Sequence, residues 1–269
     1  MHALFNTVLA EQKQYKYEGL ELFFAEAPDQ ERLRNLAAIL TSMALDFVTI
    51  HELSHIILGH LEFLETTDTD GLEEVASETE PNVVNAAQRQ ALECEADSIA
   101  LNAISRLVGS LHLFRPGIQL AFDGADRYHL VAAYTCAIDI VVKVFLATNA
   151  RYSALSGTLF PAQMLAFWRS FEHPHPFIRA MFMKQTWTKR IGARQGWDEA
   201  RLGDAIKLGT MTANTLLPNP PKGGVELGLE VMTAISECER IEKVLGEIRG
   251  GRQLPASFVK LGRDLSRFV

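Results

Sequence analysis

The feature that most constrains the fold of this chain is a pair of histidines one helical turn apart in an apolar stretch. The segment reads His51-Glu52-Leu53-Ser54-His55, and mainly apolar residues precede and follow it. Side chains four positions apart share one face of an α-helix, so both imidazoles can reach one point. Polar groups in apolar surroundings need partners, and a metal ion would supply one to both rings. The pattern predicts a largely buried helix that carries a metal site.

The glutamate between the two histidines indicates what such a metal would do. An HExxH segment on a helix is typical of zinc sites in which the glutamate is the general base. The composition of the chain predicts roughly 0.02 chance matches to this motif, so its occurrence is informative. Glu52 lies about 100° round the helix from His51, where it can act on a metal-activated water rather than bind the metal. We therefore expect Zn²⁺ on His51 and His55, with Glu52 as the catalytic base.

A catalytic zinc usually has three protein ligands, so a third ligand is expected elsewhere in the chain. His60 lies five residues after His55, about 140° off the ligand face of a continuous helix, and is not the expected ligand. Glu93 and Asp97 are four apart on a second helix, where like charges repel each other unless a cation lies between them. We expect Glu93 to be the third ligand and Asp97 to accept a hydrogen bond from a ligand histidine.

Two neighbours of Glu93 on the same helix bear on this expectation. Arg89 lies one turn earlier and could instead form a surface ion-pair ladder with Glu93, which is the alternative to a metal site. Glu95 points almost oppositely to Glu93, so we expect it to face solvent or a basic neighbour.

Helix signals dominate the rest of the chain, so the expected fold class is mainly α, with at most a short strand or hairpin at residues 17–24. The stretch from Leu36 to Leu64 is apolar on nearly every face, and we expect that helix to be central and buried. The helices are expected at about residues 33–64, 82–108, 126–148, 161–171, from 176, 198–212 and 226–248.

The clearest linker signal is the segment at residues 215–224, which is rich in proline and glycine. It separates an expected metallopeptidase domain at residues 1–214 from an expected C-terminal helical appendage at residues 225–269.

Charge and cysteine content restrict partners and compartment. The net charge of −7 disfavours nucleic-acid binding, which needs a basic face. The chain has three cysteines and no CxxC pair, which fits a reducing compartment. No signal peptide is apparent, so a cytoplasmic location is expected. The C-terminal basic residues are interpreted as a solvated tail: Arg249, Arg252, Lys260, Arg263 and Arg267.

The best candidate for a membrane span is the apolar run from Leu130 to Ala147. It carries Asp139 and Lys143 near its middle, at the spacing of a helical ion pair. Charges at a bilayer centre are costly, so a buried core helix is the better interpretation, and no membrane span is expected.

Three motifs in order resemble a known family. The three motifs are the HExxH segment, the segment Glu93-Cys94-Glu95-Ala96-Asp97, and the segment that begins His173-Pro174-His175-Pro176 and ends at Arg179. Their order resembles the HExxH…ExxAD…HPxxxxR pattern of the CAAX-prenyl-protease and Oma-type gluzincin peptidases. Some members also carry a histidine at the position of His60. The resemblance covers about Leu36 to Arg179 and implies a zincin-like helical metallopeptidase core.

The chain departs from this family in two ways. Typical members have transmembrane segments or an export signal, neither of which is expected in this sequence, and the acidic loop between the first two motifs is its own. A soluble bacterial branch, or the phage-exclusion Lit-type peptidases that also carry HExxH, is therefore the alternative at the subfamily level.

The segment that contains His173 and His175 has several possible roles. One of these histidines, or Arg179, could stabilise the oxyanion of a tetrahedral intermediate. One histidine could instead be a fourth metal ligand in a latent state. The alternative is a rigid turn with exposed imidazoles, because prolines on both sides stiffen the backbone.

Together these features predict a zinc-dependent endopeptidase that hydrolyses peptide bonds of a protein or peptide substrate with a metal-activated water. The alternative is a peptidase-like regulatory or interaction protein that retains the zinc site without catalysis. A helical interaction module without metal is a third class. The oligomeric state is left open.

Overall fold

The structure is a computed structural model, and every regular element in its described part is helical. A mainly α fold is therefore confirmed, with no strand among the described residues. Residues 161–171 are helical where the structure describes them, and most of residues 17–24 lie outside the described part. The structure describes residues 23–26, 28–60, 63–64, 83–114, 126–148, 165–166, 168–169, 173–217 and 224–251.

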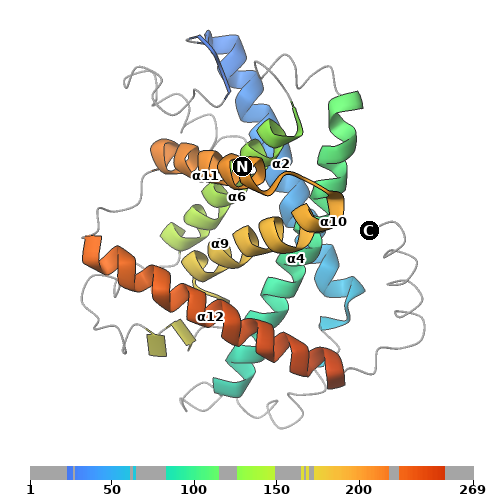
Figure 1. The fold of residues 1–269 in the computed structure, drawn as a ribbon, viewed down its shortest axis with the longest axis vertical. Coiled ribbons are helices and arrows are strands. Elements are labelled where there is room, and N and C mark those ends of the chain that lie inside the picture. The colour runs from blue at the N-terminus through green and yellow to red at the C-terminus, as the bar shows by residue number, and fades with distance from the viewer. Residues whose placement is uncertain are drawn as a thin grey trace. The chain divides into compact units, whose positions relative to one another are not determined.

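The helices follow one another along the chain from α2 to α12 (Figure 1). They are α2 (Gln30–Ile57), α4 (Val83–Phe114), α6 (Arg127–Thr148), α9 (Pro176–Gln185), the π-helix η3 (Thr186–Gly192), α10 (Ala193–Gln195), α11 (Glu199–Leu216) and α12 (Gly224–Gly251).

Aspartates set the starts of three of these helices. The carboxylates of Asp29, Asp126 and Asp198 each accept a hydrogen bond from the backbone N–H three residues later, at 2.8, 3.0 and 2.8 Å. Such caps satisfy backbone donors that the helix cannot, and each typically contributes about 1 kcal/mol. The starts of α2, α6 and α11 could therefore be predicted from the sequence.

The chain divides into two compact units, which are described separately. The first unit comprises residues 1–49, 101–150 and 184–221, and the second comprises residues 50–100, 151–183 and 222–269. Helices α2 and α4 each pass from one unit into the other. The expected linker at residues 215–224 lies partly outside the described residues, and the domain boundaries beside it stay a prediction.

Helix α6 forms the core of the first unit, where α11 packs against it (Figure 1). Every residue from Leu130 to Val142 is buried, including Asp139. Gly209 of α11 lies against α6 so closely that a Cβ there would overlap the carbonyl oxygen of Ala132. The expectation of a buried core helix at this apolar run is confirmed.

Lys143 of α6 does not make the helical ion pair with Asp139 that the spacing predicted. Its Nζ donates instead to the carbonyl oxygens of Ala213 and Leu217, at 3.2 and 2.7 Å, and to Oδ1 of Asn214 at 2.6 Å. These acceptors lie at the C-terminal end of α11, where backbone carbonyls have no helical partner and a cation is favoured. Burial lowers the pKa of Lys143 to about 8.

Helix α2 differs from its prediction in length and in burial. It ends at Ile57, and the chain turns at Gly59, whose φ of 65° is the left-handed conformation that favours glycine. It is not buried on nearly every face, because three apolar side chains are about half exposed. These are Leu45 (48%), Leu53 (47%) and Ile56 (55%).

By length and composition alone, α2 is long and apolar enough to cross a membrane, the one such helix found in the described part of the chain. A core helix of a soluble protein and a segment near the N-terminus meet the same criterion, so this is weak evidence. The expected cytoplasmic location and the absence of a membrane span stay predictions.

The second unit is built on an apolar cluster shared by α4, α9 and α12. Leu92 of α4, Phe182 of α9 and Ile241 of α12 are each at most 1% exposed within it. A buried carboxylate adds a polar connection, since Glu237 of α12 accepts hydrogen bonds from Arg169 and Arg240. Removing such a set of side chains from water is the main force that holds α12 against α4 and α9.

Candidate metal centre

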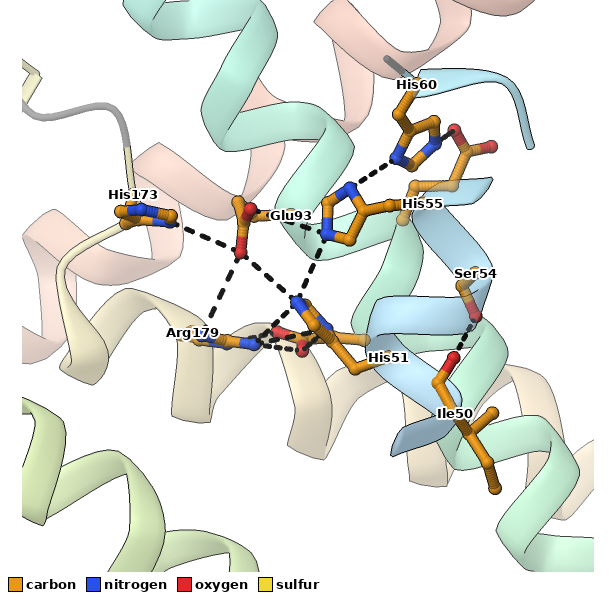
Figure 2. A network of polar contacts seen from close by, with 10 residues as sticks. Ile50, His51, Ser54, His55, His60, Glu93, His173 and Arg179 are labelled. Atoms are coloured by element: carbon orange, nitrogen blue, oxygen red, sulfur yellow. Dashed lines mark hydrogen bonds and ion pairs between the residues drawn. The ribbon is translucent and has the colours of Figure 1, made fainter. Parts of the chain in front are cut away.

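Three side chains from two helices meet in the second unit. Nε2 of His51 and Nε2 of His55, both on α2, are 3.2 Å apart. The Glu93 carboxylate on α4 approaches both, with Oε2 3.4 Å from His51 Nε2 and Oε1 3.4 Å from His55 Nε2 (Figure 2). The structure therefore brings together the three ligands expected from the sequence.

The side chains of His51, His55 and Glu93 form a triangle whose size suits a small cation. Zinc binds imidazole nitrogen and carboxylate oxygen at ~2.0–2.1 Å, so neighbouring ligand atoms of a tetrahedral site lie about 3.3–3.4 Å apart. The two Nε2 atoms are 3.2 Å apart, and each is 3.4 Å from a different oxygen of Glu93, so each of these pairwise distances is close to that spacing. With one ligand atom taken from each residue, the three atoms lie within 4.8 Å of one another. Two imidazole lone pairs and a carboxylate this close together repel one another unless a cation or a proton lies among them. Two nitrogens and one carboxylate oxygen form a donor set that suits zinc.

Asp97 lies behind His51 and orients it. Its Oδ1 is 2.9 Å from His51 Nδ1, and its side chain is fully buried. Because an ionised carboxylate can only accept, Nδ1 of His51 carries the proton, and in the neutral ring the lone pair of Nε2 is left to face Glu93. The role expected for Asp97 agrees with this placement.

Arg179 of α9 holds Asp97 in turn. Its Nε and Nη2 donate to the two oxygens of Asp97, each at 2.6 Å, which is the paired geometry that a guanidinium favours with a carboxylate. Its Nη1 is 4.0 Å from Oε2 of Glu93. Arg179 therefore binds Asp97 and lies beside Glu93, whereas the sequence pattern allowed it to be an oxyanion donor.

His60 is not part of the triangle, as helical periodicity predicted, but it lies closer to the site than that argument implied. The phase argument assumes that the helix continues beyond His55, but the chain leaves the helix and turns at Gly59. The turn brings His60 Nδ1 to 2.9 Å from Nδ1 of His55, on the side of that ring away from Glu93 (Figure 2). His60 is fully buried and contacts a metal ligand without belonging to the triangle.

Glu95 is the acceptor for His60. The sequence predicted that Glu95 faces solvent or a basic neighbour, and in the structure it faces a basic neighbour, Arg249. The Glu95 side chain is 6% exposed, with Oε1 accepting from Nε of Arg249 at 2.8 Å and Oε2 lying 3.2 Å from Nε2 of His60. Arg249 is half exposed, but it differs from the expected tail because it lies within α12 (Gly224–Gly251) and its guanidinium donates to a buried carboxylate.

The electrostatics of the triangle favour one extra positive charge. Burial by itself lowers the pKa of His51, but hydrogen bonds to Asp97 and Glu93 raise it to about 9. Burial lowers the pKa of His55 to about 4, despite the nearby charge of Glu93. Burial would raise the pKa of Glu93, yet His173, His51 and Arg179 hold it well below its usual range. The site therefore keeps its carboxylate ionised beside a cation, which is the condition that a metal also requires.

The two histidines of the HPHP segment have different surroundings. Nδ1 of His173 is 3.4 Å from Oε2 of Glu93, and the side chain is 67% exposed, so this ring borders the triangle (Figure 2). His175 stacks on Trp168 with ring centroids 4.3 Å apart, and its Nδ1 accepts from the backbone N–H of Phe177 at 3.2 Å. Its ring therefore helps to form the start of α9, as the rigid-turn alternative implied.

Glu52, the expected base, is exposed on α2 directly after His51. Its carboxylate is not part of the triangle formed by His51, His55 and Glu93. An exposed carboxylate beside the ligand face can reorient toward a substrate, which is compatible with the expected role of a base that does not bind the metal.

The arrangement can therefore hold a cation with three protein side chains and orient both imidazoles from behind, and the exposed ring of His173 lies beside it. In comparisons with protein-family models, curated proteins and solved structures, no match to this chain is found.

Proposed function

We propose that the protein is a zinc-dependent endopeptidase in which His51, His55 and Glu93 hold the metal. The observation that carries this proposal is the close approach of three side chains, in which the two Nε2 atoms are 3.2 Å apart and each is 3.4 Å from one of the two oxygens of Glu93. A zinc bound there would act as a Lewis acid on the scissile carbonyl and lower the pKa of a water toward ~7. The proposed cofactor is Zn²⁺, and the proposed substrate is a protein or peptide.

Glu52 is the proposed base. It follows a metal ligand directly on the same helix, and it is exposed where a substrate can approach it. Its carboxylate would take a proton from the attacking water and pass it to the leaving amine, a role that typically contributes about 10²–10⁴-fold in rate.

His173 is the better placed of the two HPHP histidines to stabilise an oxyanion. It is exposed and within 3.4 Å of a ligand oxygen, while Arg179 is already engaged with Asp97 through two nitrogens. Arg179 is better suited to hold Asp97 and Glu93 in place. His175 is not proposed to act on substrate, because its ring is stacked on Trp168.

At the family level, we propose a relationship to the CAAX-prenyl-protease and Oma-type gluzincins, on the strength of the three motifs alone. A soluble bacterial branch or the Lit-type peptidases remains the subfamily alternative. A cytoplasmic location without a membrane span fits the soluble alternatives.

The proposal is tested by metal content and cleavage together. Purified protein should hold about one zinc per chain, and Glu52→Gln should keep that zinc while losing activity by about 10²–10⁴-fold in kcat. Because the substrate is not named by the site, cleavage is measured by profiling proteome-derived peptides with wild type and Glu52→Gln in parallel. Absence of zinc uptake would reject the metal site. Zinc uptake with identical peptide profiles would favour the non-catalytic, peptidase-like alternative.

A further inference from the structure

A continuous chain of polar contacts leads from the candidate metal centre to helix α12. His55 contacts His60, His60 contacts Glu95, and Glu95 contacts Arg249, at 2.9, 3.2 and 2.8 Å. All four residues belong to the second unit. Figure 2 shows the contact between His55 and His60. Nothing in the HExxH or ExxAD pattern predicts this chain of contacts.

The donors and acceptors along these contacts can be assigned in order. A Glu95 carboxylate paired with Arg249 only accepts, so Nε2 of His60 must carry a proton. In a neutral His60 ring, Nδ1 is then an acceptor. The contact of 2.9 Å therefore requires that Nδ1 of His55 be the donor. This assignment leaves the lone pair of His55 Nε2 pointing at Glu93 and His51.

The result matches the arrangement behind the other ligand. There, Asp97 accepts from Nδ1 of His51 and is held by Arg179 of α9. Behind His55, His60 replaces the carboxylate as the direct acceptor, and Glu95 with Arg249 of α12 stands one step further back. Each ligand imidazole is thus oriented by a separate acceptor, and an arginine fixes the carboxylate behind it.

We propose that His60 and Glu95 are positioning residues for the metal ligand His55, and that Arg249 makes α12 part of the metal centre. This inference rests on the proposed zinc site. It adds that the affinity for zinc depends on a residue 156 positions beyond the last ligand, Glu93, in a helix that the sequence had placed in an appendage.

Burial makes these contacts effective. His60 and Glu95 are both buried, so water does not replace a lost partner at either residue. Arg249 is different, because its side chain is 51% exposed. Its substitution removes one of the contacts that orient Glu95 while leaving the apolar surface of α12 in place, which makes it the most informative position to change.

The test is zinc affinity, measured with Zn²⁺ and a competing chromogenic chelator on the full chain. His60→Phe keeps a ring but has no acceptor, and zinc binding should weaken by about 10–100-fold. His60→Asn, whose Oδ1 can accept from His55, should weaken it less. Arg249→Gln should weaken binding by roughly 3–10-fold, the smaller effect reflecting its greater distance from the metal.

Arg240→Gln is the matched control on the same helix. Arg240 donates to Gln90 of α4 and to Glu237 of its own helix and is not part of the contacts that lead to His55, so its loss should leave zinc affinity unchanged. Equal weakening by Arg240→Gln and Arg249→Gln would overturn the specific role of Arg249. Unchanged affinity in both His60→Phe and Arg249→Gln, with wild type binding zinc, would overturn the inference and leave the proposed function intact.

Two further outcomes are decisive. If His60→Phe does not fold, as judged by circular dichroism and thermal unfolding, His60→Asn and the half-exposed Arg249 carry the test. If wild type takes up no zinc, both the proposed function and this inference are rejected.

Discussion

At the scale of single residues, the candidate metal centre depends on which ring nitrogen of each histidine is already engaged. Asp97 engages Nδ1 of His51, and His60 engages Nδ1 of His55. Both Nε2 atoms are thereby directed toward Glu93, and neither imidazole has to rotate to bind a metal. Pre-orientation of this kind reduces the conformational entropy lost on binding.

Zinc binding should release protons, chiefly from His51. The pKa of His51 is raised to about 9 in the metal-free protein, so the ring is protonated at pH 7, and zinc must displace that proton from it. His55, with a pKa lowered to about 4, is already neutral. We expect about one proton released per zinc at pH 7, and an affinity that rises with pH until about pH 9.

Calorimetric titration in buffers of different ionisation enthalpy measures this release directly. A zinc affinity that stays constant between about pH 6.5 and pH 9 would contradict it. The stability of the metal-free protein should change with pH in the opposite direction to the zinc affinity. The raised pKa of His51 contributes stability that is fully present below about pH 6.5 and is lost as the pH rises through about 9.

The ligand Glu93 and the supporting Asp97 should differ in the size of their effects. Glu93→Ala removes a metal ligand and should abolish most zinc binding. Asp97→Ala leaves all three ligands but frees the ring of His51 and the side chain of Arg179, so a loss of about 10–100-fold is expected. Chelator competition measures both variants. A larger effect at Asp97 than at Glu93 would mean that Glu93 is not a ligand.

At the scale of elements, the ends of helices matter as much as their faces. Gly59 follows α2 in a left-handed conformation, and the turn there places Nδ1 of His60 against Nδ1 of His55. Lys143 binds the last carbonyls of α11. Helical periodicity predicted correctly that His60 is outside the ligand set but not its contact with His55, and it predicted a different partner for Lys143, because periodicity describes the interior of a helix and not the chain beyond it.

Two glycines of α11 should respond in opposite ways to alanine. Gly209→Ala would place its Cβ into the Ala132 carbonyl and 2.9 Å from the Thr135 Cβ, so α11 must move away from α6. We expect a loss of about 1–3 kcal/mol in unfolding free energy, as for other overpacked positions. Gly203→Ala meets nothing within 4 Å and should stabilise the helix by about 0.5–1 kcal/mol.

Urea unfolding monitored by circular dichroism measures both variants. Equal changes at Gly203 and Gly209 would mean that the close approach of α6 and α11 does not hold in solution.

At the scale of the whole molecule, zinc should act as a stabilising ligand. A ligand that binds only the folded chain adds about 2.7 kcal/mol to the free energy of unfolding at roughly 100 times its Kd. We expect the thermal unfolding temperature to rise with zinc concentration in wild type. In the His51→Ala/His55→Ala double variant this increase should disappear. Magnesium, which prefers oxygen ligands, serves as the control cation. Equal stabilisation by both cations would argue against a specific zinc site.

Local sequence features were sufficient for the helical fold class, for the starts of α2, α6 and α11, and for the three candidate ligands. The caps are set by residues only three apart, and the HExxH face is set by residues four apart. Glu93 and Asp97 could be proposed because a metal site imposes a known number of ligands, a constraint that reaches across the chain. These properties depend on helical geometry, which is the same wherever a helix occurs.

Only the tertiary structure decided which residues orient the two ligand histidines. The contact of Arg249 with Glu95 joins residues 154 positions apart, and that of Arg179 with Asp97 joins residues 82 apart. The role of His60 depended on one glycine dihedral, and the exposure of Leu53 and Ile56 depended on which elements cover α2. Such contacts follow from how helices pack, and packing responds to the shape and volume of every side chain at the interface rather than to any short pattern.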